Sequence, residues 1–112
     1  MSQNANQELQ LKYNNYKETL TELEEKLMEL RKDEEEHKIV VATLEKTPAE
    51  RRCFRMVGGA LVEHTAGEQL PLLQNKLKNI TSMCETITTE LKKLREEFEN
   101  WKKEKKIQIV RE

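Results

Sequence analysis

The sequence predicts a mainly α fold, an antiparallel two-helix coiled-coil hairpin with a short central β-hairpin. Three observations support this fold class. Charged residues make up 37% of the 112 residues and aromatic residues only 4%, which is typical of long solvated helices rather than a globular core. Two segments of similar length carry apolar residues at coiled-coil spacing, and a linker rich in turn signals separates them. We expect one domain over residues 1–112.

The first helix is expected over residues 8–46. Its seam residues are spaced by alternating threes and fours for about five heptads, as in a coiled coil. These residues are Leu9, Tyr13, Tyr16, Leu20, Leu23, Leu27, Leu30, Glu34, His37, Val41 and Leu44. No Gly or Pro interrupts the segment, and Thr47-Pro48 ends it because proline disfavours helical dihedral angles in the preceding residue.

The linker, residues 47–67, has the signature of a β-hairpin. Two short apolar runs flank Gly58-Gly59, and a two-residue hairpin turn needs residues that accept positive φ. An isolated hairpin is marginal in water and exposes unpaired strand edges. The pairing of these edges with hairpins of other chains is favoured over a cap folded onto the helix ends. The residues too apolar to stay exposed are Phe54, Met56, Val57, Leu61 and Val62.

The second helix is expected over residues 68–106, followed by a flexible tail over residues 107–112. Thr65 and Glu68 could form a capping box at its start, whereas Pro71 leaves the first residue of the helix open. Its seam residues are Leu70, Leu73, Leu77, Ile80, Cys84, Ile87, Leu91, Leu94, Phe98 and Trp101.

Two antiparallel registers would bring the seams together. We prefer the one that avoids placing Asp33 beside Glu90, although exposed pairs are worth only about 0–1 kcal/mol. The pairs of the preferred register are Leu44–Leu70, Leu30–Cys84, Leu20–Leu94 and Tyr13–Trp101.

Several polar and sulfur side chains could carry chemistry. Glu34 and His37 could form a proton relay or a metal pair, but no third ligand is visible. A polar layer that fixes the coiled-coil register is therefore favoured. Cys84 is expected to be a small buried hydrophobe, Cys53 to pack within the hairpin, and His64 to be a solvated loop residue. We expect no disulfide, no metal site and no catalytic residues.

Charge and motifs exclude several classes of function. The 20 Lys and Arg residues are balanced by 21 Asp and Glu residues, which argues against binding to nucleic acid or an anionic membrane. No apolar run reaches the roughly 18 residues of a membrane span. The polar beginning lacks the apolar region of a signal peptide, so we expect a cytoplasmic protein with the nucleus as a second compartment. No phosphate-binding loop motif occurs, and we expect neither a cofactor nor enzyme activity.

The end of the hairpin where both termini meet is expected to be apolar. These side chains are either ordinary seam residues at fraying ends or an adaptable surface that grips another molecule. They are Leu9, Leu11, Tyr13, Tyr16, Phe98, Trp101, Ile107, Ile109 and Val110.

Residues 52–63, RCFRMVGGALVE, with residues 68–73, EQLPLL, closely resemble the β-type subunits of the prefoldin family. Weaker matches occur at residues 12–16, 98–102 and 107–110. The resemblance covers nearly the whole chain, and the hairpin is its most specific part.

The resemblance implies a subunit of a cytosolic hetero-hexamer built from two α-type and four β-type subunits. In that family, each β-type hairpin joins an intermolecular β-barrel, and the coiled-coil tips hold unfolded actin and tubulin for the cytosolic group II chaperonin without using ATP. The resemblance assigns client binding to the tip, which consists of the nine apolar residues named above at the end of the hairpin where both termini meet. A structural coiled-coil adaptor or tethering subunit without chaperone activity is the alternative. The resemblance assigns subunit assembly to Cys53, Phe54, Arg55, Met56, Val57, Gly58, Gly59, Ala60, Leu61 and Val62.

Overall fold

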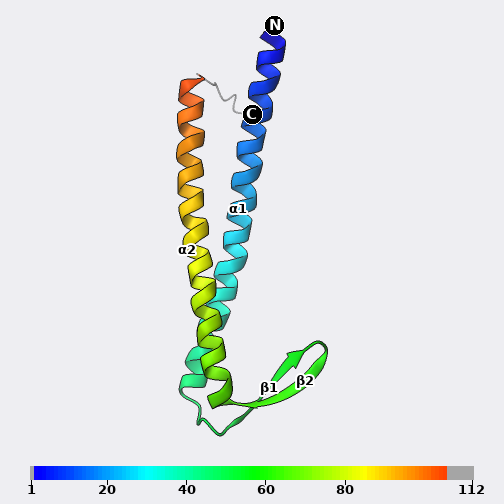
Figure 1. Cartoon of the computed structure of the whole chain (residues 1–112), viewed down its shortest axis with the longest axis vertical. Helices are drawn as coiled ribbons and strands as arrows, with labels where there is room; N and C mark the ends of the chain where they lie inside the picture. The colour runs from blue at the N-terminus through cyan, green and yellow to red at the C-terminus, as the bar shows by residue number, and fades with distance from the viewer. Residues whose placement is uncertain (1, 106–112) are drawn as a thin grey trace. The chain divides into compact units, whose positions relative to one another are not determined.

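The computed structural model describes residues 2–105 and contains two long helices with an antiparallel two-stranded sheet between them in the chain (Figure 1). The elements are α1 (Ser2–Glu45), β1 (Arg52–Val57), β2 (Ala60–Thr65) and α2 (Ala66–Glu104). The expected fold class is therefore confirmed. Both helices begin earlier than expected, and the tail expected at residues 107–112 lies outside the described part of the chain.

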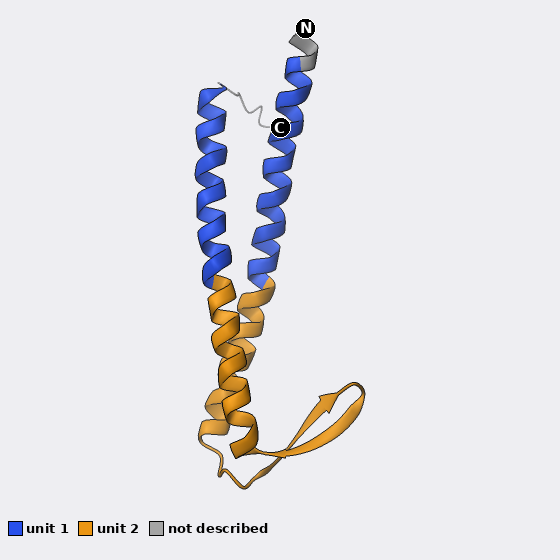
Figure 2. Ribbon diagram, viewed as in Figure 1, with its two compact units in different colours: residues 1–28, 85–112 blue, residues 29–84 orange. Residues whose placement is uncertain are grey.

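The chain divides into two compact units (Figure 2). The first unit holds residues 1–28 and 85–112, and the second holds residues 29–84 with both strands. Within each unit, contacts across the helices run antiparallel. Tyr16–Phe98 and Glu34–Thr81 lie within one residue of the preferred register, whereas Glu24–Arg95 and Glu45–Gln74 lie about five residues from it. The contacts are Tyr16–Phe98 and Glu24–Arg95 in the first unit, and Glu34–Thr81 and Glu45–Gln74 in the second.

The seam residues predicted from the sequence are the ones that the structure shields from solvent. All seam positions in both helices are buried or half-buried, while most residues between them are exposed. This is the pattern of two helices that each hide one apolar stripe. No helix within residues 2–105 is both long and apolar enough to cross a membrane. The buried apolar residues are Val41, Ala66, Ile80, Cys84, Ile87, Leu91, Phe98 and Trp101.

The end of α1 is tightened by short-range hydrogen bonds. The Thr47 backbone N–H donates to the Leu44 carbonyl at 3.1 Å, and the Thr47 hydroxyl donates to the Thr43 carbonyl at 2.7 Å. These bonds satisfy carbonyl groups that the end of a helix would leave unpaired. Pro48 follows directly, so the expected stop signal lies where the helix ends.

The start of α2 is held by the linker that precedes it. The Glu68 N–H donates to Thr65 Oγ1 at 3.3 Å, which is one half of the expected capping box. The Gly67 N–H donates to the Ala49 carbonyl at 3.0 Å. A Cβ on Gly67 would come within 3.2 Å of Ala49 Cβ, so this close approach favours glycine. Pro71 lies inside the helix rather than at its start.

Candidate functional site

The β-hairpin closes with the two-residue turn that the sequence indicates. Strand pairing runs from Arg52 opposite Thr65 to Val57 opposite Ala60. Gly58 and Gly59 have φ of 56° and 82°, and nothing lies within 4 Å of a Cβ built on either residue. Two positive φ angles define a primed turn, so backbone conformation rather than crowding requires glycine here.

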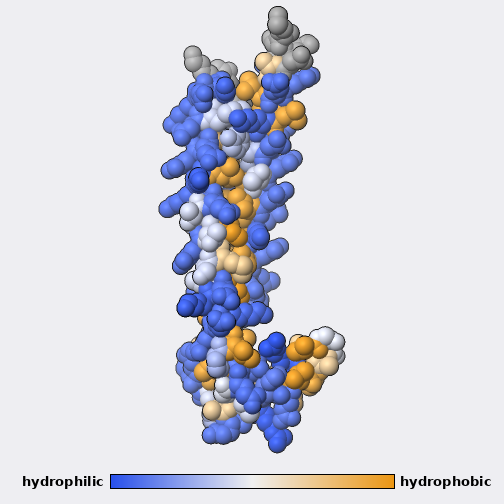
Figure 3. All heavy atoms as spheres, in the orientation of Figure 1, coloured by the Kyte–Doolittle hydropathy of each residue, from blue (hydrophilic) through white to orange (hydrophobic). Residues whose placement is uncertain are grey.

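One face of the hairpin is apolar and open. Because side chains alternate along a strand and cross-strand partners share a face, Phe54, Met56 and Leu61 point to the same side. They are 61%, 66% and 64% exposed, and Figure 3 shows apolar side chains gathered on the hairpin. Arg52 and Glu63 form an ion pair of 3.1 Å near the base of the strands. This face is therefore a small apolar surface with a charged margin.

The other face of the hairpin turns towards the start of α2. Arg55 Nη1 donates to Gln69 Oε1 at 3.4 Å, and Cys53 and Val62 are half-buried. His64 lies within β2 opposite Cys53, and its Nδ1 is 3.5 Å from Glu68 Oε2. The expectation of a solvated loop histidine was therefore wrong, because strand pairing continues through this residue and brings it against the helix.

Gln69 is a buried polar residue that the sequence analysis missed. It is 4% exposed, and its Nε2 has no hydrogen-bond partner in the structure of residues 2–105. It precedes the first seam leucine, Leu70, and seam spacing alone gives no signal for a buried amide there. Its contact with Arg55 links the hairpin to α2 within the second unit.

Glu34 and His37 form the polar layer expected in the seam. Thr81 Oγ1 donates to Glu34 Oε2 across the helices at 2.8 Å, and His37 Nδ1 lies 2.8 Å from the Asp33 carbonyl oxygen on its own helix. No group of three or more potential metal ligands occurs among residues 2–105. The contacts support the structural interpretation of these residues.

Four aromatic side chains form a cluster in the first unit. The Phe98 ring stacks on Tyr16 with centroids 5.0 Å apart and meets the edge of Tyr13 at 5.4 Å. The Trp101 ring lies 5.5 Å from Tyr16, whereas the sequence analysis placed it beside Tyr13. Phe98 and Trp101 are 6% and 5% exposed, so their rings close the coil rather than face solvent.

Lysines surround this aromatic cluster. Lys12 lies over the Trp101 ring at 5.7 Å, Lys17 over Tyr13 at 5.6 Å and Lys102 over Phe98 at 4.4 Å. Such cation–π contacts are worth about 0.5–1 kcal/mol at exposed sites. Trp101 Nε1 is buried without a hydrogen-bond partner within the described part of the chain.

The predicted client-binding residues divide into three groups. The structure brings Tyr13, Tyr16, Phe98 and Trp101 together, leaves Leu9 half-buried and exposes Leu11. Their role in client binding stays a prediction. The predicted residues Ile107, Ile109 and Val110 lie outside the described residues.

The sequence and the structure of this chain are similar to those of known proteins. A family described as Prefoldin subunit matches residues 7–112. The chain is 44% identical to prefoldin subunit 2 of Saccharomyces cerevisiae, covering 95% of this chain and 96% of that protein. It is 40% identical to a probable prefoldin subunit 2 of Schizosaccharomyces pombe, covering 93% and 91% of the two chains. The crystal structure of the prefoldin beta subunit from Thermococcus strain KS-1 superposes with a TM-score of 0.74 at 18% identity, covering 84% of this chain and 82% of that one.

Proposed function

The chain belongs to the prefoldin subunit family, and from this membership we propose that it works as one subunit of the hexameric prefoldin co-chaperone. In this proposal it assembles with α-type and further β-type subunits. The assembly captures unfolded actin and tubulin without ATP and delivers them to the cytosolic group II chaperonin. The proposed compartment is the cytoplasm, with the nucleus as a second one.

The observation that carries the proposal is the open apolar face of the hairpin. Full burial of a large apolar side chain is worth about 1.5–3 kcal/mol, so covering the exposed parts of Phe54, Met56 and Leu61 would contribute roughly 3–6 kcal/mol. Within residues 2–105, neither outer strand edge of this two-stranded sheet has a neighbouring strand. Pairing with hairpins of neighbouring subunits in a closed β-barrel would satisfy the edge groups, and closure of the barrel would cover the apolar face.

A role as a plain coiled-coil adaptor fits the two helices but leaves this hairpin unexplained. An adaptor needs only the seam to pair its helices. In such an adaptor the hairpin with its primed Gly58-Gly59 turn would serve no purpose. Its exposed Phe54, Met56 and Leu61 would also raise the risk of aggregation, because exposed apolar strands promote it. Assembly with other subunits would bury these apolar side chains, so the adaptor is the weaker candidate.

The test is native mass spectrometry of the tagged protein purified from its own cells. We expect a six-subunit complex for the natural chain and loss of that complex when Met56 and Leu61 are both replaced by glutamate. Met28→Glu is the matched control because Met28 is 72% exposed on α1, away from the hairpin in sequence. A homodimer of the natural chain, or intact hexamers from the hairpin variant, would refute the proposal.

A further inference from the structure

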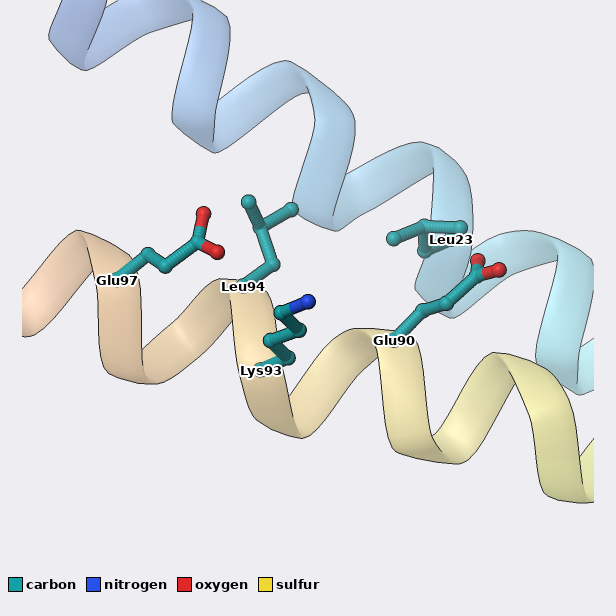
Figure 4. A pocket seen from close by; sticks show the side chains of 5 residues that line it. All are labelled: Leu23, Glu90, Lys93, Leu94 and Glu97. Atoms are coloured by element: carbon teal, nitrogen blue, oxygen red, sulfur yellow. The ribbon is translucent and has the colours of Figure 1, made fainter.

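Two adjoining hollows lie along the helices in the first unit. One is lined by Leu23, Glu90, Lys93, Leu94 and Glu97, and Figure 4 shows Leu94 pointing from α2 towards α1 among these charged side chains. The other is lined by Lys12, Asn15, Tyr16, Thr19 and again Leu94. Each has a volume of about 260 Å³. Because they share Leu94, they form one shallow groove with an apolar floor.

The groove runs along one side of the seam. The opposite side carries the Glu24–Arg95 ion pair, with Arg95 Nη2 2.9 Å from Glu24 Oε1. In an antiparallel coil, the two sides of the seam are lined by different residues. Glu24 and Arg95 each come directly after a seam leucine, and such residues line one side. Residues that come directly before a seam leucine line the other side. Thr19 and Glu90 belong to the second group, directly before Leu20 and Leu91. The groove therefore lies opposite the bridged side.

The charges along the groove are polarised. Lys12 is the charged residue of one hollow, and its contact with the Trp101 ring holds the ammonium at that end. The other hollow has Glu90 and Glu97 on either side of Lys93 and is net acidic. In the antiparallel register the two ends lie about nine residues apart along the coil, which is roughly 13 Å at 1.5 Å per residue.

We propose that this groove holds one short extended segment of an unfolded polypeptide, with an acidic residue near Lys12 and a basic residue near Glu90 and Glu97. A large apolar side chain between them would lie on Tyr16, Leu94 and Leu23. A strand rises about 3.3 Å per residue, so the acidic and basic residues are about four positions apart. This inference rests on the proposed chaperone function and specifies the class of segment that the subunit prefers.

The burial of the neighbouring aromatic cluster supports this assignment. Phe98 and Trp101 are occupied by contacts with Tyr13 and Tyr16, so they offer little surface to a client while the coil stays closed. Tyr16 belongs both to the cluster and to the floor of the groove. The groove thus offers apolar contact without opening the cluster. Exposed ion pairs are weak, which suits a site that must release its client.

The test measures binding of fluorescent nonapeptides to the assembled complex by anisotropy. Each peptide carries Leu-Phe between two charged positions four residues apart, and the charges are acidic and basic, both acidic, or both basic. We expect the mixed peptide to bind about three- to fivefold more tightly than either like-charged peptide, as one exposed ion pair allows. In a complex with Lys12→Glu, the preference should move to the peptide with two basic residues.

A second pair of variants tests whether the peptide binds in the groove or elsewhere on the coil. Thr19→Arg places a long side chain in the groove at an exposed helical position, and Thr21→Arg makes the same change outside it. We expect at least fivefold weaker binding of the mixed peptide with Thr19→Arg and no change with Thr21→Arg. Equal effects of the two variants, or binding without charge preference, would overturn the groove assignment.

The outcomes also distinguish the groove from the proposed function. If the natural complex suppresses aggregation of unfolded actin but shows no charge preference for peptides, the groove assignment fails and the chaperone function stands. If it suppresses no aggregation, the proposed function itself fails. Loss of the hexamer with Thr19→Arg, seen by native mass spectrometry, would show that a neighbouring subunit fills the groove and would also overturn the assignment.

Discussion

Replacing Gln69 by glutamate should stabilise the chain, although it places a carboxylate at a buried position. The Gln69 Nε2 group lacks a partner, and a buried donor left unpaired costs about 1–3 kcal/mol. A carboxylate replaces that donor with a second acceptor oxygen, which a small shift of the Arg55 guanidinium can pair, and turns the 3.4 Å contact from Arg55 into a charge-assisted bond, which is roughly twice as strong as a neutral one. The change also adds negative charge in the first turns of α2, worth about 0.3–1 kcal/mol.

Desolvation of the new carboxylate opposes these gains. Burial of an ion costs several kcal/mol after relaxation, and only a well-placed partner offsets most of this cost. Arg55 can act as that partner by moving closer than its present 3.4 Å, because its side chain already contacts residue 69 at a partly buried position. We therefore expect a net gain of about 1 kcal/mol, which would raise the melting temperature by roughly 4–8 °C.

Thermal and urea unfolding of the full chain, followed by far-UV circular dichroism, would measure this gain. In an Arg55→Ala background the same Gln69→Glu change should destabilise the chain by about 1 kcal/mol or more, because the carboxylate is then buried without a partner. Asn75→Asp adds a carboxylate at an exposed position of α2 and should change stability by less than about 0.5 kcal/mol. An equal gain with and without Arg55 would refute the role of the Arg55–Gln69 contact.

Two further substitutions test the turn and the aromatic cluster. Gly59→Ala should destabilise the hairpin by about 1–2 kcal/mol because φ is 82° there, and hydrogen exchange should rise in β1 and β2 but not in α1. Phe98→Ala should cost about 3–5 kcal/mol by leaving a cavity between Tyr13, Tyr16 and Trp101, whereas Phe98→Leu should cost less, as urea unfolding would show. Equal losses from the two Phe98 variants would argue against a packed cluster.

The features that the sequence predicts well are those encoded by spacing. Alternation by threes and fours identifies the seam residues that leave the solvent, and Gly58-Gly59 identifies the turn. Both patterns act through local backbone geometry, so neighbouring residues in the chain suffice to find them.

The features that the sequence could not supply depend on contacts between elements. The Arg55–Gln69 bond requires the hairpin to fold back onto the start of α2, and no spacing rule specifies that direction. The burial of Trp101 on Tyr16 rather than Tyr13 reflects how large rings fill the space between helices within one turn of the expected register. The groove beside Leu94 arises from the same packing.

The two apolar regions of the chain differ in how their side chains are used. On the hairpin, Phe54, Met56 and Leu61 are largely exposed, so a partner gains their burial without first breaking contacts. In the aromatic cluster, Phe98 and Trp101 already pack against the tyrosines, and a ligand would gain contact with them only by giving up that packing. Strong association is therefore expected at the hairpin and weak, reversible association at the groove. The proposed ATP-independent co-chaperone role requires this difference, because the assembly would have to persist through many cycles of client binding.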